Sequence, residues 1–329
     1  MLSKLLRSSF VVCSALALGC GPSDRMTDTV GGDDDGAAGV DAGGSDNPND
    51  PDRAEKCNRM DLVFVIDDSG SMVEEQENLA ANFDDFIAVL EAYQTEDGQP
   101  LDYRVAVTTS GRDLSYTIDE EPITIPGIGT IDPPPIPFNE AGDNGLFRQG
   151  CGMSRPWLER TDGDVSTTFA CVAEVGTGGP SIEMPLQTSR MALEGTINQG
   201  FLREDALLAL VILTDEDDCS RPDNNFTVQS DQCYPEWPGQ PPVSDFVAFF
   251  DSLTGERGRW ATAVIAGPGP GTCSSQFGEA FEARRLKQFV DQTGENAVFS
   301  SICDGDLASA LASAIANFTA ACDSFPPVE

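Results

Sequence analysis

Two uninterrupted apolar runs constrain the fold of this chain more than any other feature. Residues 61–67 place five apolar side chains between two aspartates, and residues 206–213 are apolar throughout. Runs of this length that include β-branched side chains predict strands buried on both faces, which is typical of a parallel sheet. Such a sheet needs helices to cover both of its faces.

Further strands and helices alternate with these two runs. Residues 72–93 carry an apolar stripe at helical spacing, with acids in the first turns, where the helix dipole favours negative charge. The order predicts an α/β fold: a doubly wound, mostly parallel central sheet with helices on both faces. The other expected helices are residues 183–198, 243–253, 277–292 and a closing helix marked by Leu307, Leu311, Ile315 and Phe318; the other expected strands are residues 103–108, 260–266 and 297–300.

The charge balance and the missing histidine exclude several functions. The chain has 55 Asp+Glu against 19 Lys+Arg, a formal net charge of -36. A chain this acidic cannot neutralise phosphates, which argues against nucleic acid and fits a solvated surface, a bound cation or a basic partner. Because His is absent, Ser-His-Asp and Cys-His catalytic systems and histidine zinc sites are excluded. Any metal must be held by oxygen or sulfur.

The first 19 residues have the pattern of an export signal. Lys4 and Arg7 precede a short apolar stretch at residues 10–18. Residues 16–20 read Leu-Ala-Leu-Gly-Cys, which resembles the bacterial lipobox. The resemblance implies cleavage before Cys20, lipid modification of Cys20, and anchoring of the exported chain to the bacterial envelope, at the outer membrane or cell surface. The alternative is an ordinary signal peptide cut nearby, with Cys20 incidental.

Residues 20–56 have the composition of a disordered tether. Nine aspartates lie between Asp24 and Asp52, interleaved with Gly, Ala, Ser, Asn and Pro. Such a segment buries too little apolar surface to offset its ordering entropy, and charge repulsion extends it. The folded domain is therefore expected over residues 57–324.

Eight cysteines follow the lipid-modification candidate. An even number in an exported chain predicts four disulfides, although the sequence alone does not fix their connectivity. Proximity along the chain favours Cys151–Cys171, Cys219–Cys233 and Cys273–Cys303. The remaining pair, Cys57–Cys322, would join the two ends of the domain.

A Pro- and Gly-rich insertion interrupts the alternation at about residues 111–164. Loops this long are usually functional or disordered. The insertion follows the strand expected at residues 103–108, so it should emerge at the edge where the other parallel strands end. We expect it to flank a site at that edge and to shape partner choice; a decorative surface insertion is the alternative.

Polar residues follow both apolar runs, at residues 67–72 and 214–218. In doubly wound sheets, ligands bind beyond the carboxyl ends of the strands, where the direction of winding switches. The oxygens of Asp67, Ser69, Ser71 and Asp215 suit Mg²⁺, Mn²⁺ or Ca²⁺. For Asp217 and Asp218 we expect a solvated acidic loop; binding of a second ion is the alternative.

These segments resemble the von Willebrand factor type A (VWA) family over about residues 57–322. Residues 65–72 read Val-Ile-Asp-Asp-Ser-Gly-Ser-Met and resemble its Asp-x-Ser-x-Ser motif, and residues 211–215 resemble its second acidic strand end. In that family the site is a metal-ion-dependent adhesion site. The resemblance implies that Ser69 and Ser71 bind the metal directly, and that Asp67 and Asp215 bind it directly or through water.

The third loop departs from the family pattern. The family usually offers Gly-Gly-Thr, with the Thr as ligand, whereas residues 176–183 read Gly-Thr-Gly-Gly-Pro-Ser-Ile-Glu. Aligned on the two glycines, Pro180 takes the Thr position and has no side-chain oxygen. Ser181, Glu183 or Thr177 can replace it; Glu183 is the strongest donor and Ser181 is the nearest by alignment. A metal-free, vestigial site is the alternative.

The expected function is binding rather than catalysis. Neutral hydroxyls leave much of the cation's charge uncompensated, so an open coordination position attracts a carboxylate from a protein partner, as the resemblance implies. One alternative is a disulfide-braced scaffold lipoprotein. A second is a Mg²⁺-dependent phosphatase like the haloacid dehalogenases, which need an Asp where this chain has Ser69.

Overall fold

The computed structural model describes residues 57–95, 98–232, 238–276, 278–305 and 307–326. The expected signal segment, Cys20 and the expected tether lie outside these ranges. In the part that is described, no helix is both long and apolar enough to cross a membrane.

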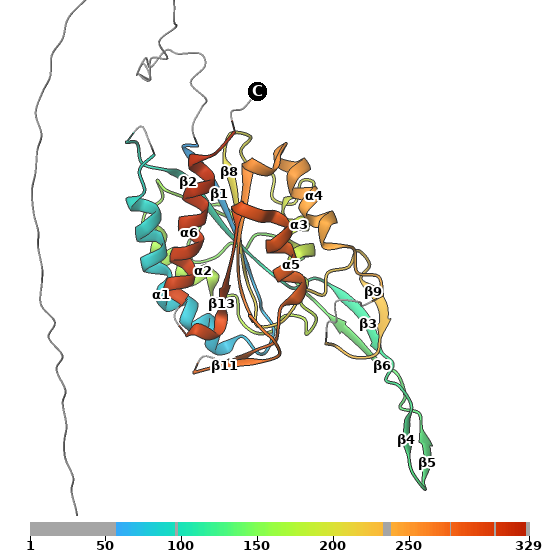
Figure 1. Ribbon diagram of the computed structural model, residues 1–329. Coiled ribbons are helices and arrows are strands. Elements are labelled where there is room, and N and C mark those ends of the chain that lie inside the picture. Colours follow the sequence, from blue (N-terminus) through green and yellow to red (C-terminus); the bar gives the residue numbers. More distant parts are fainter. Residues whose placement is uncertain (1–56, 96–97, 233–237, 277, 306, 327–329) are drawn as a thin grey trace, which may run out of the picture. The chain divides into compact units, whose positions relative to one another are not determined.

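A six-stranded sheet forms the centre of the domain, in the order β13-β10-β8-β1-β2-β7 (Figure 1). Every neighbouring pair is parallel except the edge pair of β2 and β7. This confirms the predicted fold class. The strands are β1 (Arg59–Ile66), β2 (Asp102–Thr109), β7 (Leu158–Glu159), β8 (Leu207–Leu213), β10 (Trp260–Ala266) and β13 (Ala297–Ser301).

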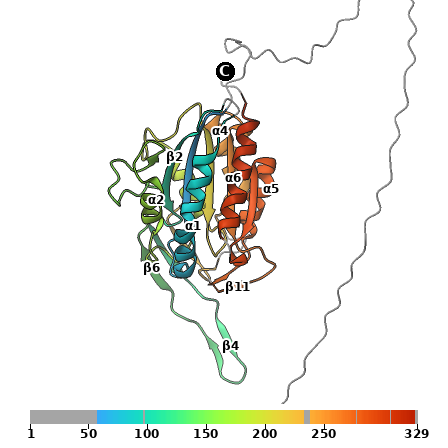
Figure 2. The ribbon, with the colours of Figure 1, turned by 90° about the vertical axis from the view of Figure 1, so that its left-hand side faces the viewer.

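Helices cover both faces of the sheet (Figures 1 and 2). One face carries α1 (Val73–Ala92), α2 (Val165–Ala173) and α6 (Leu307–Asp323). The other carries α3 (Pro185–Leu193), α4 (Val243–Thr254) and α5 (Arg284–Thr293). Three short 3-10 helices complete the described helices: Arg257–Arg259, Gly294–Asn296 and Ile302–Asp304.

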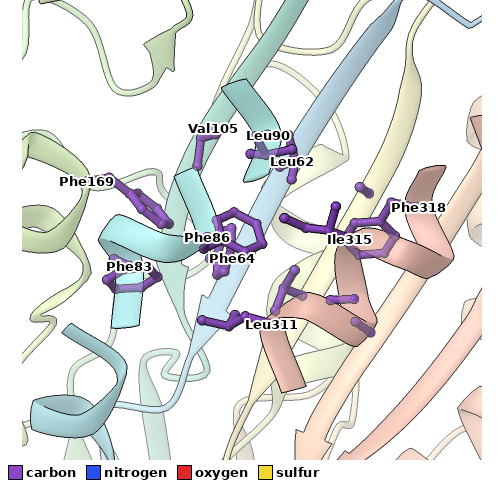
Figure 3. Close-up of a cluster of buried hydrophobic side chains, with 14 of the residues drawn as sticks. Leu62, Phe64, Phe83, Phe86, Leu90, Val105, Phe169, Leu311, Ile315 and Phe318 are labelled. Carbon is purple, nitrogen blue, oxygen red and sulfur yellow. The ribbon is translucent and has the colours of Figure 1, made fainter. Parts of the chain in front are cut away.

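Alternating side chains of β1 pack in two separate hydrophobic cores, one on each face of the sheet. Leu62 and Phe64 face α1 and α6, whereas Val63 and Val65 face the helices on the other side. Figure 3 shows the first core, in which Phe64 packs edge-on against phenylalanines of α1 and α2. Strand β8 is buried at every position. This two-sided burial fixes where β1 and β8 end, and hence where the polar residues after them lie.

Two expected helices need correction, and one helix was not expected. The helix expected at residues 277–292 starts only at Arg284, because residues 278–280 form β12 (Gly278–Ala280) and pair with β11 (Cys273–Ser275). The helix expected at residues 183–198 is α3, which starts at Pro185, a residue that suits the first helical turn. It ends at Leu193, just before Gly195 with φ +73°. The sequence analysis missed α2.

The insertion is folded. Strand β3 (Leu114–Ile118) lies between β6 (Ile136–Glu140) and β9 (Asn225–Val228), and β4 (Ile123–Ile125) forms a hairpin with β5 (Gly129–Ile131). Tyr116 stacks on Phe138 and Phe226, one from each neighbouring strand. The small β3–β6–β9 sheet packs on Ile182 and Met184. It therefore contacts the residues on either side of Glu183.

Three of the four expected disulfides are bonded in the structure: Cys57–Cys322, Cys151–Cys171 and Cys273–Cys303. The fourth expected pair includes Cys233, which lies outside the described residues. Cys57 directly precedes β1, and Cys322 lies in the last turn of α6. The first and last elements of the domain are thus covalently joined.

Candidate metal centre

The segments that follow β1 and β8 lie side by side. The two strands are parallel neighbours with Ile66 opposite Leu213, and the backbone N–H of Asp67 donates to the Leu213 carbonyl at 2.9 Å. Along the chain, β1 is followed by α1 and then by β2, which pairs with one side of β1. Strand β8, which comes later in the chain, pairs with the other side. The chain therefore winds away in opposite directions at this point, which is where doubly wound sheets bind ligands.

The Asp67 carboxylate is fully buried and held by uncharged donors. Its Oδ1 accepts from the Ser69 backbone N–H at 2.8 Å and the Ser110 hydroxyl at 3.2 Å, and its Oδ2 accepts from the Thr214 hydroxyl at 2.6 Å. Burial raises the pKa of Asp67, and the hydrogen bond from Thr214 opposes that rise. A buried carboxylate with neutral donors favours a nearby cation.

Two serine hydroxyls lie beside Asp67. The Oγ atoms of Ser69 and Ser71 are 3.0 Å apart. Ser69 is buried and Ser71 is exposed. Both line a cavity of about 240 Å³, together with Ser181, Glu183 and Glu216. The hydroxyls therefore face a space that a ligand can enter.

Two further carboxylates each have a buried oxygen without a partner. Asp215 is 2% exposed and Glu183 is 1% exposed. Within the described ranges, Oδ1 of Asp215 and Oε2 of Glu183 accept no hydrogen bond. Burial, with the charge of Asp67 second, raises the pKa of Asp215 to about 8 and that of Glu183 well above its ordinary value. Buried acceptors without donors are costly, and a cation would satisfy both.

Glu216 extends this acidic pair. Burial raises its pKa to about 7, and a hydrogen bond with Glu183 opposes that rise. The sequence places Glu216 directly after Asp215, but nothing in the spacing distinguishes it from the other acids at residues 214–218. Its role in the cluster is visible only in three dimensions.

Gln76 and Gly179 fix the third loop against the end of β1. The Gln76 side chain donates to the carbonyls of Asp67 and Gly176, both at 2.8 Å, and accepts from the Gly176 N–H at 3.1 Å. The Gly179 N–H donates to the Asp68 carbonyl at 2.7 Å. A Cβ on Gly179 would lie 2.3 Å from Cγ of Asp68, so this position requires glycine. Glu183 is carried by the loop that these contacts hold.

The three candidates for the third-loop ligand lie in different environments. Glu183 is buried next to the charges of Asp67 and Asp215. Ser181 is exposed, and its backbone N–H and hydroxyl both donate to Glu140 of the insertion, at 3.2 and 3.1 Å. Thr177 is exposed. Burial and electrostatics favour Glu183.

Sequence reasoning missed the residues that support Asp67. Ser110 and Thr214 each donate a hydroxyl to its carboxylate, and Gln76 binds its carbonyl. Ser110 and Thr214 both stand immediately after a strand at the same edge of the sheet. That position was a usable signal, whereas the inward direction of Gln76 on α1 was not.

The expectation that Asp217 and Asp218 lie in a solvated loop is wrong. Asp217 accepts from the backbone N–H groups of Arg285 and Leu286 at the start of α5, and Asp218 pairs with the Arg285 guanidinium at 3.2 Å. Both aspartates are buried. Because Arg285 and Leu286 already occupy their oxygens, Asp217 and Asp218 are not candidate cation ligands. The remaining candidates lie directly after β1 and β8 and in the third loop.

No three His, Cys, Asp or Glu side chains in the described residues form a group that could hold a metal ion by themselves. The candidate set therefore depends on the hydroxyls of Ser69 and Ser71. Asp67, Ser69, Ser71, Asp215 and Glu183 supply carboxylate and hydroxyl oxygens, the donors that Mg²⁺, Mn²⁺ and Ca²⁺ take. Together with the unpartnered oxygens of Asp215 and Glu183, this donor set fits a divalent cation.

Comparison with known proteins gives only remote structural similarity. No protein-family profile and no curated protein matches the chain. Among solved structures, proximal thread matrix protein 1 from the mussel byssus matches with a TM-score of 0.40 and 10% identity, over 80% of this chain and 49% of that one. The same protein "with zinc occupied MIDAS motif" gives 0.37 and 13%, over 81% and 46%.

A bacterial structure matches at a similar level. The pilus adhesin SpaC from Lactobacillus rhamnosus GG, in an open conformation, matches with a TM-score of 0.38 and 12% identity, over 81% of this chain and 30% of that one. The chain thus spans about half, or less, of the length of these proteins. Similarity this remote assigns neither a family nor a function to the chain.

Proposed function

We propose that the domain binds a divalent cation at the carboxyl ends of β1 and β8 and uses the cation to hold a protein partner. The observation that carries the proposal is the pair of buried, unpartnered carboxylate oxygens on Asp215 and Glu183. Glu183 lines the same cavity as the Ser69 and Ser71 hydroxyls, and Asp215 is hydrogen-bonded to the Ser71 side chain.

The cation ligands in this proposal are Asp67, Ser69, Ser71 and Asp215, with Glu183 replacing the threonine of the VWA pattern. Ser181 is the second choice, because it lines the same cavity but donates to Glu140. The ion is Mg²⁺, Mn²⁺ or Ca²⁺, and its chemistry is to offer a positive centre to an oxygen of the partner. Gln76, Ser110 and Thr214 hold Asp67 in place for it.

The wider context of the proposal comes from the sequence. The motifs at residues 65–72 and 211–215 support membership of the VWA family. The N-terminal pattern supports export and lipid anchoring through Cys20 to the bacterial envelope. The partner offers a carboxylate to the cation, and the sheet that β3 and β6 of the insertion form with β9 packs on the residues on either side of Glu183. Ser69 in the position that a haloacid dehalogenase fills with Asp supports binding rather than catalysis.

Calorimetric titration with Mg²⁺, Mn²⁺ and Ca²⁺ tests the cation site. The chain without residues 1–20 is compared with its Ser69→Ala/Ser71→Ala variant. We expect the dissociation constant to rise about 100-fold or more in the variant, since losing even outer-shell support of a metal costs 10–100-fold. The matched control is Ser115→Ala, an exposed serine on β3. Equal binding by all three proteins would end the proposal and favour the disulfide-braced scaffold.

A further inference from the structure

The β4–β5 hairpin projects from the insertion (Figures 1 and 2). Its two three-residue strands pair antiparallel, with Ile123 opposite Ile131 and Ile125 opposite Gly129. Residues 119–122 and 132–135 connect it to β3 and β6, the strands of the small sheet beside the third loop. A two-stranded ribbon of this length is marginally stable in water unless something packs against it.

The hairpin has one apolar face and one polar face. Ile123 and Ile131 are a cross-strand pair, and alternation puts Ile125 on their side. The hydroxyls of Thr124 and Thr130 lie 3.1 Å apart on the opposite side. Exposed fractions are 54% for Ile123, 50% for Ile131 and 76% for Ile128 at the tip. Clustered exposed isoleucines of this kind mark interaction surfaces.

Proline limits how another molecule can bind this ribbon. Pro122 and Pro126 flank β4, and Pro133, Pro134 and Pro135 follow β5. Because proline has no backbone N–H, an added strand could pair only with the few residues of each strand that lie between these prolines. The isoleucine side chains, rather than the strand edges, are therefore the surface available for contact.

The charges around the apolar face select the occupant. Asp119, Glu120 and Glu121 precede β4 and Asp132 follows β5, and all four are exposed. Residues 113–147 contain no Lys or Arg. With a net charge of -36 on the whole chain, a second copy and an anionic membrane are both repelled. A partner surface that is apolar at its centre and basic at its border would complement the isoleucines and the surrounding acids of the hairpin.

We infer that the isoleucine face of the β4–β5 hairpin docks into an apolar groove of a partner protein, and that lysines or arginines border this groove. The contact adds a second attachment point beside the cation site, because the small sheet at the base of the hairpin packs on Ile182 and Met184 around Glu183. Two linked contacts strengthen binding without either one being tight. The hairpin contact itself needs no cation.

A model peptide with the inferred chemistry tests the docking surface. The probe is an amphipathic helical peptide of leucine and lysine, and its matched control replaces every lysine with glutamate. We expect the chain without residues 1–20 to bind the lysine peptide, with or without EDTA. Ile123→Ser/Ile128→Ser/Ile131→Ser should weaken binding about tenfold or more, since each isoleucine contributes apolar contact area. This variant keeps the net charge, so non-specific attraction is unchanged.

A second variant separates this face from other exposed apolar residues. Leu146→Ser/Ile197→Ser removes two side chains that are 52% and 41% exposed elsewhere, and it should bind the lysine peptide like the unmodified chain. Equal binding by the hairpin variant would overturn the inference. So would hairpin-dependent binding to phosphatidylethanolamine–phosphatidylglycerol vesicles without peptide binding, or hairpin-dependent self-association in sedimentation. Loss of cation binding alone would leave the inference standing.

Discussion

Asp61 lies near the amino end of β1 and Asp67 directly follows its carboxyl end, and both are fully buried. The Arg203 guanidinium lies 2.7 Å from Oδ1 of Asp61, and the Arg203 backbone N–H donates to Oδ2 at 2.7 Å. Asp67 instead accepts from two hydroxyls and a backbone N–H. At the amino end of β1 the buried carboxylate of Asp61 therefore has an arginine partner. At the carboxyl end the buried carboxylate of Asp67 has no positively charged partner among the residues that the structure describes.

The difference separates a structural acid from a candidate ligand. At the amino end the fold supplies its own counter-charge, so no outside ion is needed. At the carboxyl end Glu183 and Asp215 bring further negative charge towards Asp67, which raises the pKa of both groups in addition to their burial. Buried charge is tolerated when it is paired. The carboxyl end of β1 thus lacks the positive counter-charge that Arg203 gives the amino end, and a divalent cation would supply it.

The largest expected effect tests the amino end. Arg203→Met leaves Asp61 buried and unpaired, so we expect the free energy of unfolding to fall by about 3–5 kcal/mol. Urea unfolding measures this value. The matched control is Arg59→Met, because Arg59 pairs with the more exposed Asp205 and Asp102 and should change stability by about 0–1 kcal/mol. Similar losses of unfolding free energy in the two variants would mean that the buried Asp61–Arg203 pair matters no more than an exposed one.

The second prediction tests the carboxyl end. Glu183→Gln should raise the dissociation constant of the divalent cation about 10–100-fold, since an uncharged amide is a weaker ligand. Without divalent cations the same variant should be at least as stable as the unmodified chain, because it removes a buried carboxylate. Calorimetry and urea unfolding measure the two quantities. Ser181→Ala is the control; a loss there, with none in Glu183→Gln, would exchange the roles of these two residues.

A smaller effect concerns the close approach that holds the third loop. Gly179→Ala puts a Cβ against the Asp68 carboxylate, and overpacking of this kind costs about 1–3 kcal/mol. Gly178→Ala is the neighbouring control, since nothing lies within 4 Å of its added Cβ. Thermal unfolding should distinguish the two variants. Equal melting temperatures would mean that the loop moves freely relative to β1.

The last prediction is a pH dependence. Without divalent cations, folded Asp215 holds its proton up to about pH 8, whereas the unfolded chain releases it near the ordinary pKa of 3.8. In that window the folded state binds more protons, so stability falls as pH rises. We expect Tm to be about 3 °C lower, or more, at pH 8 than at pH 5. Asp215→Asn should flatten this slope, and a slope of opposite sign would contradict the buried acidic cluster.

The central sheet could be predicted because its strands are buried on both faces. Residues 61–67 and 206–213 are apolar enough to identify without context, and their ends place Asp67 and Asp215 at one edge. The position of the insertion could be predicted from its Pro and Gly content, but its fold could not, because β3 pairs with β9, a strand about a hundred residues later in the chain. Helix α2 was missed because Val165, Thr167 and Thr168 give it weak helical propensity.

The candidate site was only partly accessible to sequence reasoning. The spacing of Asp67, Ser69 and Ser71 follows from one short turn, so a motif is enough to find them. The position of Glu183 depends on where the third loop lies, which Gln76 and Gly179 determine through contacts between distant segments. No periodicity in the sequence reports such contacts.

The Cys57–Cys322 bond also determines how the domain carries mechanical load. It closes a covalent ring across a sequence separation of 265 residues. In the proposed lipid-anchored protein, tension on the chain before Cys57 would be shared between β1 and α6, which the bond joins. Strand β1 cannot be peeled from the sheet on its own, because its amino end is bonded to α6, the helix that packs over β8, β10 and β13. Reduction of this one bond would leave β1 to bear such tension alone, from its amino end.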